Sequence, residues 1–237
     1  MEDFASPVRG NRTFAASRRV RWGDADPSGR LRLDSLLRYL QDVSNDDTRD
    51  AGADPAAPWV VRRTRVRVES PIRLGEMVEL TTFCGGVGSR WAERRTTLHS
   101  ERGGHIEAAS LWVFLDSRGR PAKLPAEFLD TWGAGEREVG ARLRHEPPPD
   151  AAASRAWVLR STDLDMLNHV NNAATWEAVE DECTRRGVVP RAVELEHRDA
   201  IAPEDDVELR SVMTDAGMNM WLLTSDGTIR ASAVVVA

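Results

Sequence analysis

The chain has 237 residues, of which 41% are hydrophobic and 30% are charged, a composition typical of a folded globular protein. Its formal net charge of -6 argues against nucleic-acid binding, because that binding depends on basic surface. The sequence has no run of about 18 apolar residues and no export signal, so we expect no membrane association and a cytoplasmic location. Cys84 and Cys183 lack metal-binding spacing and are expected to be reduced, packed thiols.

The first part of the sequence predicts a strand, a helix and four further strands. Residues 13–22 suggest the first strand, and Gly23, Pro27 and Gly29 mark the loop that follows it. Apolar residues then recur at the spacing of a helix of roughly 16 residues. They are Leu33, Leu36, Leu37, Leu40 and Val43. Strands are predicted at 59–70, 77–83, 90–100 and 105–116. Because both apolar faces need covering, we expect the sheet to wrap around the helix.

A proline run marks the boundary between two parts of the chain. Pro147, Pro148 and Pro149 cannot extend a helix or a central strand, so we read them as a connector. We therefore divide the chain into an N-terminal repeat with its connector, residues 1–146, and a C-terminal repeat, residues 147–237. Both repeats contain a strand-like run, an Asp-x-Asp loop and a helix in that order. Arg160 in the second repeat corresponds to Arg21 in the first, an offset of 160 − 21 = 139 residues. Matching order over several elements indicates a duplication.

The C-terminal repeat predicts the same kind of fold with shorter loops. Asn171 or Asn172 can cap a helix from about Ala173 to Arg186, and Gly187 can end it. Strands are predicted at 192–198, 206–213, 218–225 and 228–237, and Asp226-Gly227 is a hairpin turn signal between the last two. The two repeats together predict a duplicated α+β fold.

The stretch from Asp163 to Glu180 is the strongest functional signal. It reads DLDMLNHVNNAATWEAVE and places acidic, histidine and asparagine side chains directly before a helix. The unpaired amides and the dipole of a helix N-terminus favour developing negative charge. With RWGDADPSGRLRLDSLLRYLQ in the first repeat and DLDMLNHVNN in the second, nearly the whole chain resembles the acyl-ACP thioesterases of plant plastids and their bacterial relatives.

The resemblance implies a double hotdog fold, in which two copies of a long helix wrapped by an antiparallel sheet form a pseudo-dimer within one polypeptide. Whether two chains then form a homodimer stays open. The implied reaction is hydrolysis of a fatty or related acyl thioester of acyl carrier protein, with no metal and no cofactor. An acyl-CoA thioesterase is a second interpretation, and a catalytically degenerate acyl-thioester binding protein is a third. A hotdog dehydratase fits the HVNN motif less well.

The family's catalytic residues are carried over only in part. Its aspartate falls on Asp165 and its histidine on His169, but its asparagine falls on Leu167 and its later glutamate on Ala200. Where HVNN sequences often carry tyrosine, this chain has Thr175. Candidate replacements for the two missing groups are Asn168 for the first, and Asp199 or Glu196 for the second.

The chemistry of thioester hydrolysis assigns roles to these residues. Asp165 is the candidate base or nucleophile, and His169 could orient it or hydrogen-bond the thioester oxygen. Backbone amides from Val170 to Asn172 are the natural oxyanion donors. We include Asn168 and Asn171 among the site residues. Each has a structural alternative, since Asp163 and Asp165 can be turn or cap residues, His169 can simply be packed, and Asn171 can be a cap.

The N-terminal repeat is predicted to bind rather than react. It has Arg30 where the second repeat has His169, so Asp24 and Asp26 are expected to stabilise the loop. Leu33, Leu37 and Leu40 are the predicted acyl-binding residues, with plain core packing as the alternative. A group of arginines could form a patch for the acidic carrier protein or a solvated sheet face, and both interpretations stay open. They are Arg62, Arg63, Arg65, Arg67, Arg90, Arg94 and Arg95.

Overall fold

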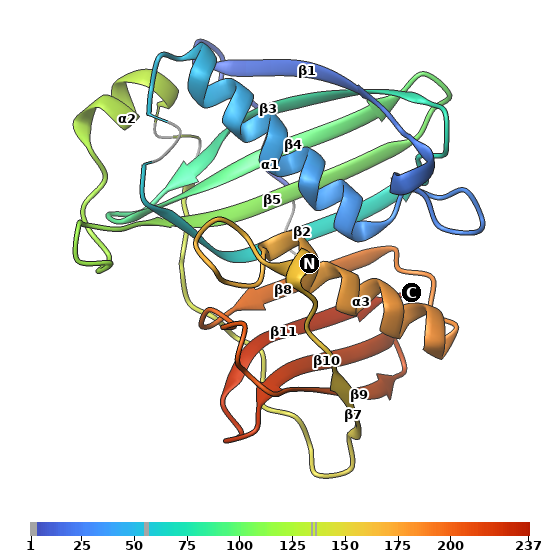
Figure 1. Ribbon diagram of the computed structural model, residues 1–237. Coiled ribbons are helices and arrows are strands. Elements are labelled where there is room, and N and C mark those ends of the chain that lie inside the picture. The colour runs from blue at the N-terminus through green and yellow to red at the C-terminus, as the bar shows by residue number, and fades with distance from the viewer. Residues whose placement is uncertain (1–3, 55–56, 134, 136) are drawn as a thin grey trace.

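A computed structural model describes residues 4–54, 57–133, 135 and 137–237. Within these residues the strands form one 11-stranded sheet in the order β1-β3-β4-β5-β2-β8-β11-β10-β9-β7, with β6 beside β3 (Figure 1). The elements of the first half are β1 (Thr13–Arg19), the 3₁₀ helix η1 (Trp22–Asp24), α1 (Leu33–Asp50), β2 (Trp59–Ser70), β3 (Met77–Val87), β4 (Trp91–Ser100) and β5 (His105–Phe114).

The later elements repeat this order after a short insertion. The insertion contains α2 (Ala126–Trp132) and β6 (Arg137–Glu138). The second half consists of β7 (Ala153–Trp157), the 3₁₀ helix η2 (Ser161–Asp163), α3 (Asn172–Arg186), β8 (Ala192–His197), β9 (Val207–Thr214), β10 (Gly217–Thr224) and β11 (Ile229–Val236). Each half of the sheet curls around its own long helix, as Figure 1 shows for α1 and α3.

The two halves join through their first long strands and through their helices. β2 pairs with β8 in antiparallel register, with Val66 opposite Val193, so the two half-sheets become one. The helices α1 and α3 pack against each other on the same side of the sheet (Figure 1). Arg38 of α1 and Glu177 of α3, which are 139 positions apart, bond to each other at 2.8 Å. Equivalent positions therefore meet at the helix pair, as in a pseudo-symmetric dimer.

The repeat predicted from the Asp-x-Asp loops is present in atomic detail. The carboxylate Oδ2 of Asp24 accepts from the backbone amide of Arg21 at 2.8 Å, and Asp163 accepts from that of Arg160 at 2.8 Å. Both contacts close a short 3₁₀ helix that leads into the next loop. The burial of Asp163, which is 3% exposed, gives it the structural role predicted as one of its two alternatives.

Most predicted elements are found near their expected bounds. Asn171 caps α3, and Gly187 ends it with a left-handed φ of 68°. The helix α2 was not predicted, because seven residues are too few to show a clear helical period. Cys84 and Cys183 are free and buried as expected, and burial raises the pKa of the Cys183 thiol to about 12. No helix among the described residues is long and apolar enough to cross a bilayer.

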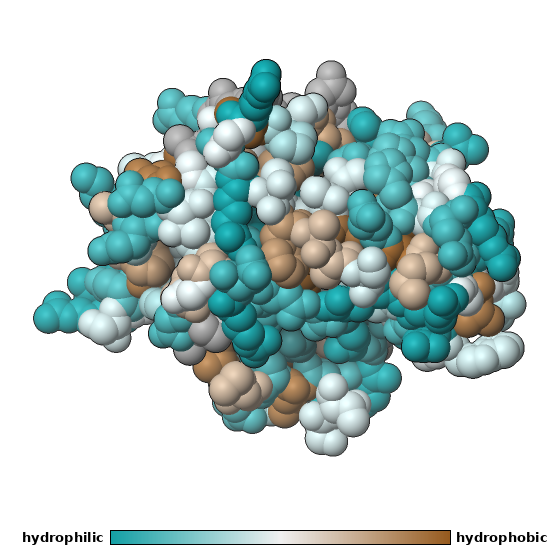
Figure 2. Space-filling model, turned by 90° about the horizontal axis from the view of Figure 1, so that it is seen from above, coloured by the Kyte–Doolittle hydropathy of each residue, from teal (hydrophilic) through white to brown (hydrophobic). Residues whose placement is uncertain are grey.

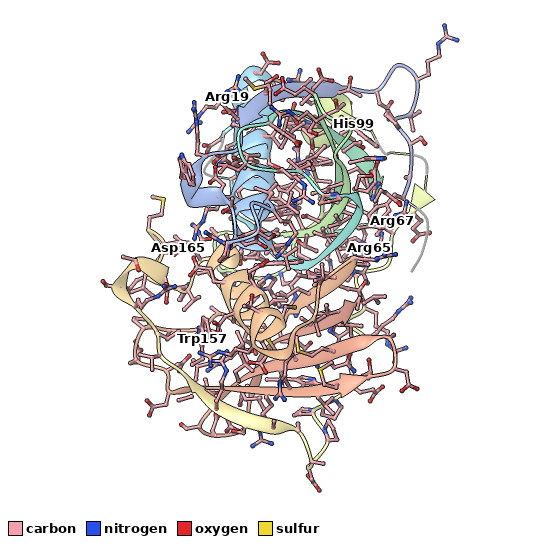
Figure 3. All side chains as sticks on the ribbon, turned by 90° about the vertical axis from the view of Figure 1, so that its right-hand side faces the viewer. Arg19, Arg65, Arg67, His99, Trp157 and Asp165 are labelled. Atoms are coloured by element: carbon pink, nitrogen blue, oxygen red, sulfur yellow. The ribbon has the colours of Figure 1, made fainter. Side chains whose placement is uncertain are left out.

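Three arginines of the central strands, Arg63, Arg65 and Arg95, are neither in a docking patch nor on a solvated face. Arg65 and Glu93 form a buried ion pair at 3.0 Å, and Arg95 pairs with Glu107 at 3.0 Å. The ring of Phe4 stacks over the Arg95 guanidinium, 3.9 Å from its carbon, which helps to cover this face of the sheet. Figure 3 shows Arg65 and Arg67 together on the strand side of the molecule, away from the helices. Both sequence interpretations were wrong for Arg63, Arg65 and Arg95, which are buried.

Candidate active site

The loop between η2 and α3 is built around the carboxylate of Asp165. Its Oδ1 accepts from the amide of Leu167 at 2.9 Å and from that of His169 at 3.3 Å. The backbone closes the same turn, since the amide of Asp165 donates to the carbonyl oxygen of His169 at 2.8 Å. Only Oδ1 takes part in these bonds, and Asp165 is half-buried while His169 is exposed. The loop thus brings Asp165, Asn168 and His169 together at the surface, where Figure 3 shows Asp165.

Asn168 has a backbone role in this loop. Its φ of 59° is left-handed, a conformation that asparagine tolerates better than most residues. The equivalent position in the first repeat is Gly29, with a φ of 82°. The neighbouring Met166 and Leu167 are 98% and 70% exposed. Leu167, which occupies the place of the family's asparagine, therefore points no polar group at the site and contributes apolar surface beside it.

The N-terminus of α3 lies directly after this loop and carries an open amide. The side chain of Asn171 accepts from the amide of Ala173 at 2.8 Å, which is an ordinary N-cap. Among the described residues no acceptor is hydrogen-bonded to the amide of Asn172. An unpaired amide at the positive end of a helix dipole can stabilise an oxyanion.

The open N-terminus faces a small cavity between the two helices. Its volume is about 10 Å³. Asn172 and Trp176 line it from α3, Leu37, Leu40 and Gln41 from α1, and His197 from β8. Two of the three predicted acyl-binding leucines are therefore at this cavity. The third, Leu33, is buried at the N-terminus of α1 and is not part of the lining.

A larger cavity of about 510 Å³ lies further along α1, within the N-terminal half. Ser44, Arg94 and Trp112 line both cavities, so the two spaces are neighbours. Five aromatic rings form much of its wall, and they are Trp59, Trp112, Phe114, Phe128 and Trp132. Its size is in the range of small-molecule binding pockets. This larger cavity is thus in the half of the chain that lacks the histidine loop.

A buried carboxylate holds the wall of this larger cavity together. Asp47, which is 1% exposed, accepts from Nη1 of Arg94 at 2.6 Å and from the indole nitrogen of Trp132 at 2.7 Å. It also accepts from Nε of Arg12 at 2.7 Å. These bonds connect α1, β4, α2 and the N-terminal segment at one point. The cavity is therefore a built feature rather than a packing defect.

The equivalent N-terminus of α1 is closed by a side chain of α3. Oε2 of Glu180 accepts from the amide of Leu33 at 3.0 Å, and its other oxygen pairs with Arg30. Glu180 and Arg30 are 9% and 15% exposed in their side chains. Leu33 and Arg30 correspond to Asn172 and His169 by the offset of 139. The first repeat therefore has the same helix end, but a protein carboxylate already occupies it.

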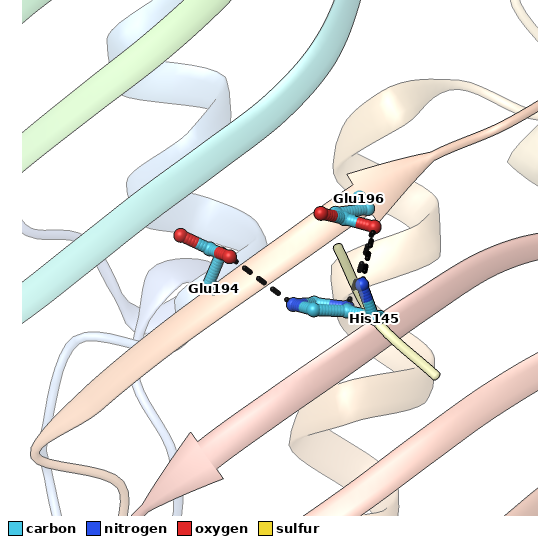
Figure 4. Close-up of side chains that lie close together, drawn as sticks. All are labelled: His145, Glu194 and Glu196. Carbon is cyan, nitrogen blue, oxygen red and sulfur yellow. Dashed lines mark hydrogen bonds and ion pairs between the residues drawn. The ribbon is translucent and has the colours of Figure 1, made fainter. Parts of the chain in front are cut away.

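Glu194 and Glu196 of β8 bind the connector at His145 and have a structural role. Glu196 is fully buried and accepts from the amides of Arg144 at 2.6 Å and His145 at 3.2 Å. The two ring nitrogens of His145 face different partners, with Nε2 3.2 Å from Glu194 (Figure 4) and Nδ1 3.0 Å from Ser232. The ligand atoms of His145, Glu194 and Glu196 lie within 4.8 Å of one another, but the contacts above already engage them within the protein. Burial acts to raise the pKa of Glu194, but the hydrogen bond with His145 and the charges of Arg63 and Arg65 outweigh it and lower this pKa.

The two candidate replacements for the family's glutamate differ in their surroundings. Glu196 is committed to the connector, whereas Asp199 is exposed and lies two residues before Ile201, whose carbonyl oxygen accepts from the amide of Val170 at 2.9 Å. Gln41 and His197 line the small cavity and were not among the predicted site residues, and Arg94, which also lines it, was predicted only as a member of the arginine group. One signal could have found Gln41, because the repeat offset places it opposite Glu180. Burial and the nearby Arg62 lower the pKa of His197 to about 4, so it is neutral at pH 7.

The fold and this site define a double hotdog thioesterase. Family models for the acyl-ACP thioesterase N-terminal domain and C-terminal domain match residues 11–132 and 147–233. The chain belongs to the acyl-ACP thioesterase family, and its reaction is the hydrolysis of an acyl thioester.

Similar proteins span nearly the whole chain. The 12:0-ACP thioesterase from Umbellularia californica has a TM-score of 0.80 at 20% identity, over 94% of this chain and 96% of that one. An acyl-ACP thioesterase from Bacteroides thetaiotaomicron has a TM-score of 0.79 at 15% identity, over 94% and 97%. An uncharacterised protein of Mycobacterium tuberculosis is 28% identical over 220 residues, which is 90% of this chain and 87% of that protein.

Proposed function

We propose that this thioesterase releases a fatty or related acyl group from acyl carrier protein and that the reaction takes place at the N-terminus of α3. The observation that carries the proposal is the open amide of Asn172 beside the Asp165–His169 loop, next to cavities in the other half. The C-terminal half then supplies the catalytic loop, and the N-terminal half holds the acyl group. This division corresponds to residues 147–237 and 1–146.

The geometry supports a direct hydrolytic mechanism. Asp165 keeps Oδ2 free of the turn's hydrogen bonds, so this oxygen can take a proton from an attacking water. His169 stands next to it in the loop and can orient the water. The water oxygen bonds to the thioester carbon, and the amide of Asn172 stabilises the resulting oxyanion. The carbon–sulfur bond then breaks, and the thiolate leaves and takes up the proton.

Asn168 and Asn171 support this site through the backbone. Asn168 permits the left-handed turn that presents His169, and Asn171 caps α3 through Ala173. By capping the second amide of the helix, Asn171 leaves the first one, that of Asn172, available for substrate. We therefore assign both asparagines positioning roles and reserve direct contact with substrate for Asp165, His169 and the Asn172 amide.

The carrier is tested by thiol release from matched acyl-ACP and acyl-CoA substrates of 6 to 18 carbons. We expect kcat/KM to be at least roughly tenfold higher with the carrier protein, because a protein carrier adds contacts outside the acyl cavity. Equal or faster hydrolysis of acyl-CoA would assign the acyl-CoA thioesterase function instead. Tight binding of acyl-ACP with no release of thiol from any substrate would identify a degenerate binding protein.

A further inference from the structure

Two enclosed polar atoms at the small cavity have no partner in the protein. The indole nitrogen Nε1 of Trp176 and the ring nitrogen Nε2 of His197 are both shielded from solvent and without a hydrogen bond among the described residues. Both residues line the small cavity. Trp176 is fully buried, at 0% exposure. A buried donor without a hydrogen bond costs roughly 1–3 kcal/mol, so such atoms are rare unless a water or a ligand provides the missing partner.

Three hydroxyl groups around the cavity already have partners. The hydroxyls of Thr64 and Ser110 bond to each other at 3.0 Å, and that of Thr96 donates to Thr82 at 3.1 Å. Among the lining residues that the structure describes, Trp176 and His197 are the ones with an enclosed side-chain polar atom that lacks a hydrogen bond. The cavity volume of about 10 Å³ corresponds to a single water-sized group. One oxygen atom placed there would satisfy the Trp176 N–H and reach His197.

The position of the small cavity indicates which part of a bound substrate would supply this oxygen. The cavity is bounded by Asn172, whose amide is the proposed oxyanion donor, and by Arg94 and Trp112, which also line the large cavity. An acyl group with its thioester carbonyl at the Asn172 amide and its chain in the large cavity would pass the small cavity just beyond that carbonyl. The guanidinium of Arg94 lies there too, held by its ion pair with Asp47 at 2.6 Å.

We propose that the acyl group hydrolysed by this enzyme carries an oxygen close to the thioester, as a 3-oxoacyl or 3-hydroxyacyl group does, and that Trp176 is the residue that selects it. The inference rests on the proposed site at α3. The indole N–H donates to the oxygen, whether that oxygen is a carbonyl or a hydroxyl. Neutral His197 can accept from a hydroxyl or donate to a carbonyl according to its tautomer. A plain saturated chain leaves both groups unpaired.

The first arm of the test compares three CoA thioesters of equal chain length, decanoyl, 3-oxodecanoyl and 3-hydroxydecanoyl. We expect kcat/KM to be roughly tenfold or more higher for at least one oxygenated substrate than for decanoyl, because a site built to hydrogen-bond a substrate group discriminates against its absence. Trp176→Phe keeps an aromatic ring and removes the N–H, and should lower this preference at least fivefold while decanoyl hydrolysis changes less.

Trp221→Phe is the matched control. Trp221 is a buried tryptophan whose indole nitrogen already donates to the carbonyl of Glu146 at 2.8 Å, far from the cavity lining. Its substitution should leave the preference between substrates unchanged. Equal hydrolysis of all three thioesters by the parent, or an equal loss on all three in Trp176→Phe, would overturn the proposal and leave the cavity as the site of a structural water.

The second arm does not depend on turnover. Thermal shifts are measured with free 3-hydroxydecanoic acid and decanoic acid, on the parent and on Trp176→Phe. We expect the hydroxy acid to raise the parent's Tm more than decanoic acid does, and this difference to vanish in the variant. If none of the three acyl groups is released from either CoA or acyl carrier protein but this difference appears, the proposed reaction fails while the oxygen site stands. If hydrolysis occurs and neither arm shows a preference, the oxygen site alone fails.

Discussion

The two long helices begin in the same way and differ in what meets their first amide. At α1 the amide of Leu33 donates to Glu180 at 3.0 Å, and Arg30 pairs with the same carboxylate. At α3 the equivalent amide of Asn172 has no acceptor among the described residues, and the residue equivalent to Glu180 is the neutral Gln41. A difference of one charge across the helix pair separates an occupied helix end from an open one.

This difference between the two helix ends explains why the duplicated fold has a single candidate site. An anion at a helix N-terminus is stabilising, so Glu180 contributes to the stability of the first repeat. The same contact prevents a substrate oxyanion from using that end. The second repeat lacks this carboxylate contact, so the amide of Asn172 stays available for the proposed reaction. Asp26 and Asp165 have the same turn geometry, with Oδ1 of Asp26 accepting from Arg30 at 2.9 Å, so the aspartate alone does not make a site.

The largest expected effect is on activity, from Asp165→Asn. The amide oxygen of asparagine can still accept from Leu167 and His169, so the turn is retained while the carboxylate base is lost. We expect kcat/KM to fall at least roughly 100-fold with little change in Tm. Asp26→Asn is the matched control in the first repeat, and its activity should stay within about threefold of the parent. Similar losses in both variants would show that the aspartates act only as turn residues.

The next effect is on stability, from Glu180→Gln. The neutral side chain can still accept from Leu33 but no longer balances the largely buried Arg30, so we expect a loss of roughly 2–3 kcal/mol in the free energy of unfolding. Denaturant unfolding measures it. Glu177→Gln is the control, because Glu177 is more exposed and its ion pairs should contribute less than about 1 kcal/mol. A loss in Glu180→Gln no greater than that in the control would mean that the occupied helix end is not a stabilising contact.

A smaller effect concerns pH. The folded pKa of His197 is about 4, below the ordinary value of 6.5, so the unfolded chain binds more protons between these values. Folding stability from this group is therefore lost as pH falls from 6.5 towards 4, by roughly 1–3 kcal/mol. His197→Asn, which does not titrate, should show a shallower fall of Tm over this range. Parallel Tm curves for parent and variant would show that His197 is not held neutral.

The smallest effect is expected from Asn171→Ala. It removes the cap on the Ala173 amide and should cost about 1 kcal/mol of unfolding free energy. Arg32 at the equivalent position of the first repeat makes no side-chain cap and instead pairs with the buried Asp34 at 2.8 Å, so the cap is particular to α3. Chemical denaturation of Asn171→Ala and the parent tests this, and no loss in the variant would mean that the cap contributes nothing to α3.

The sequence predicted the parts of this fold that depend on local pattern. The helix periods, the strand alternation, the Asp-x-Asp turns and the cap at Asn171 are short-range features, and they are where the pattern places them. The arginines of β2 and β4 were misjudged because their burial depends on partners such as Glu93 and on segments far away in sequence. Alternation along a strand cannot say whether a polar face is solvated.

Only the loop side of the candidate site was proposed from the sequence, and the cavity side was not. The loop from Asp165 to His169 and the start of α3 are contiguous in sequence, and their chemistry could be read directly. Gln41, Trp176 and His197 meet only because two helices and a strand pack together. The cavity in the N-terminal half likewise arises from α2, which is too short to be seen as a period, folding over α1 through Trp132 and Asp47.

The most direct measurement compares the two helix ends by exchanging their charges. Gln41→Glu places a carboxylate before the open amide of Asn172, and Glu180→Gln removes the charge from the occupied end at Leu33. Thiol release should fall at least roughly tenfold in Gln41→Glu, since a bound carboxylate competes with the oxyanion, and should change little per folded molecule in Glu180→Gln. Full activity in Gln41→Glu together with its loss in Glu180→Gln would place the reaction at α1 and contradict this account.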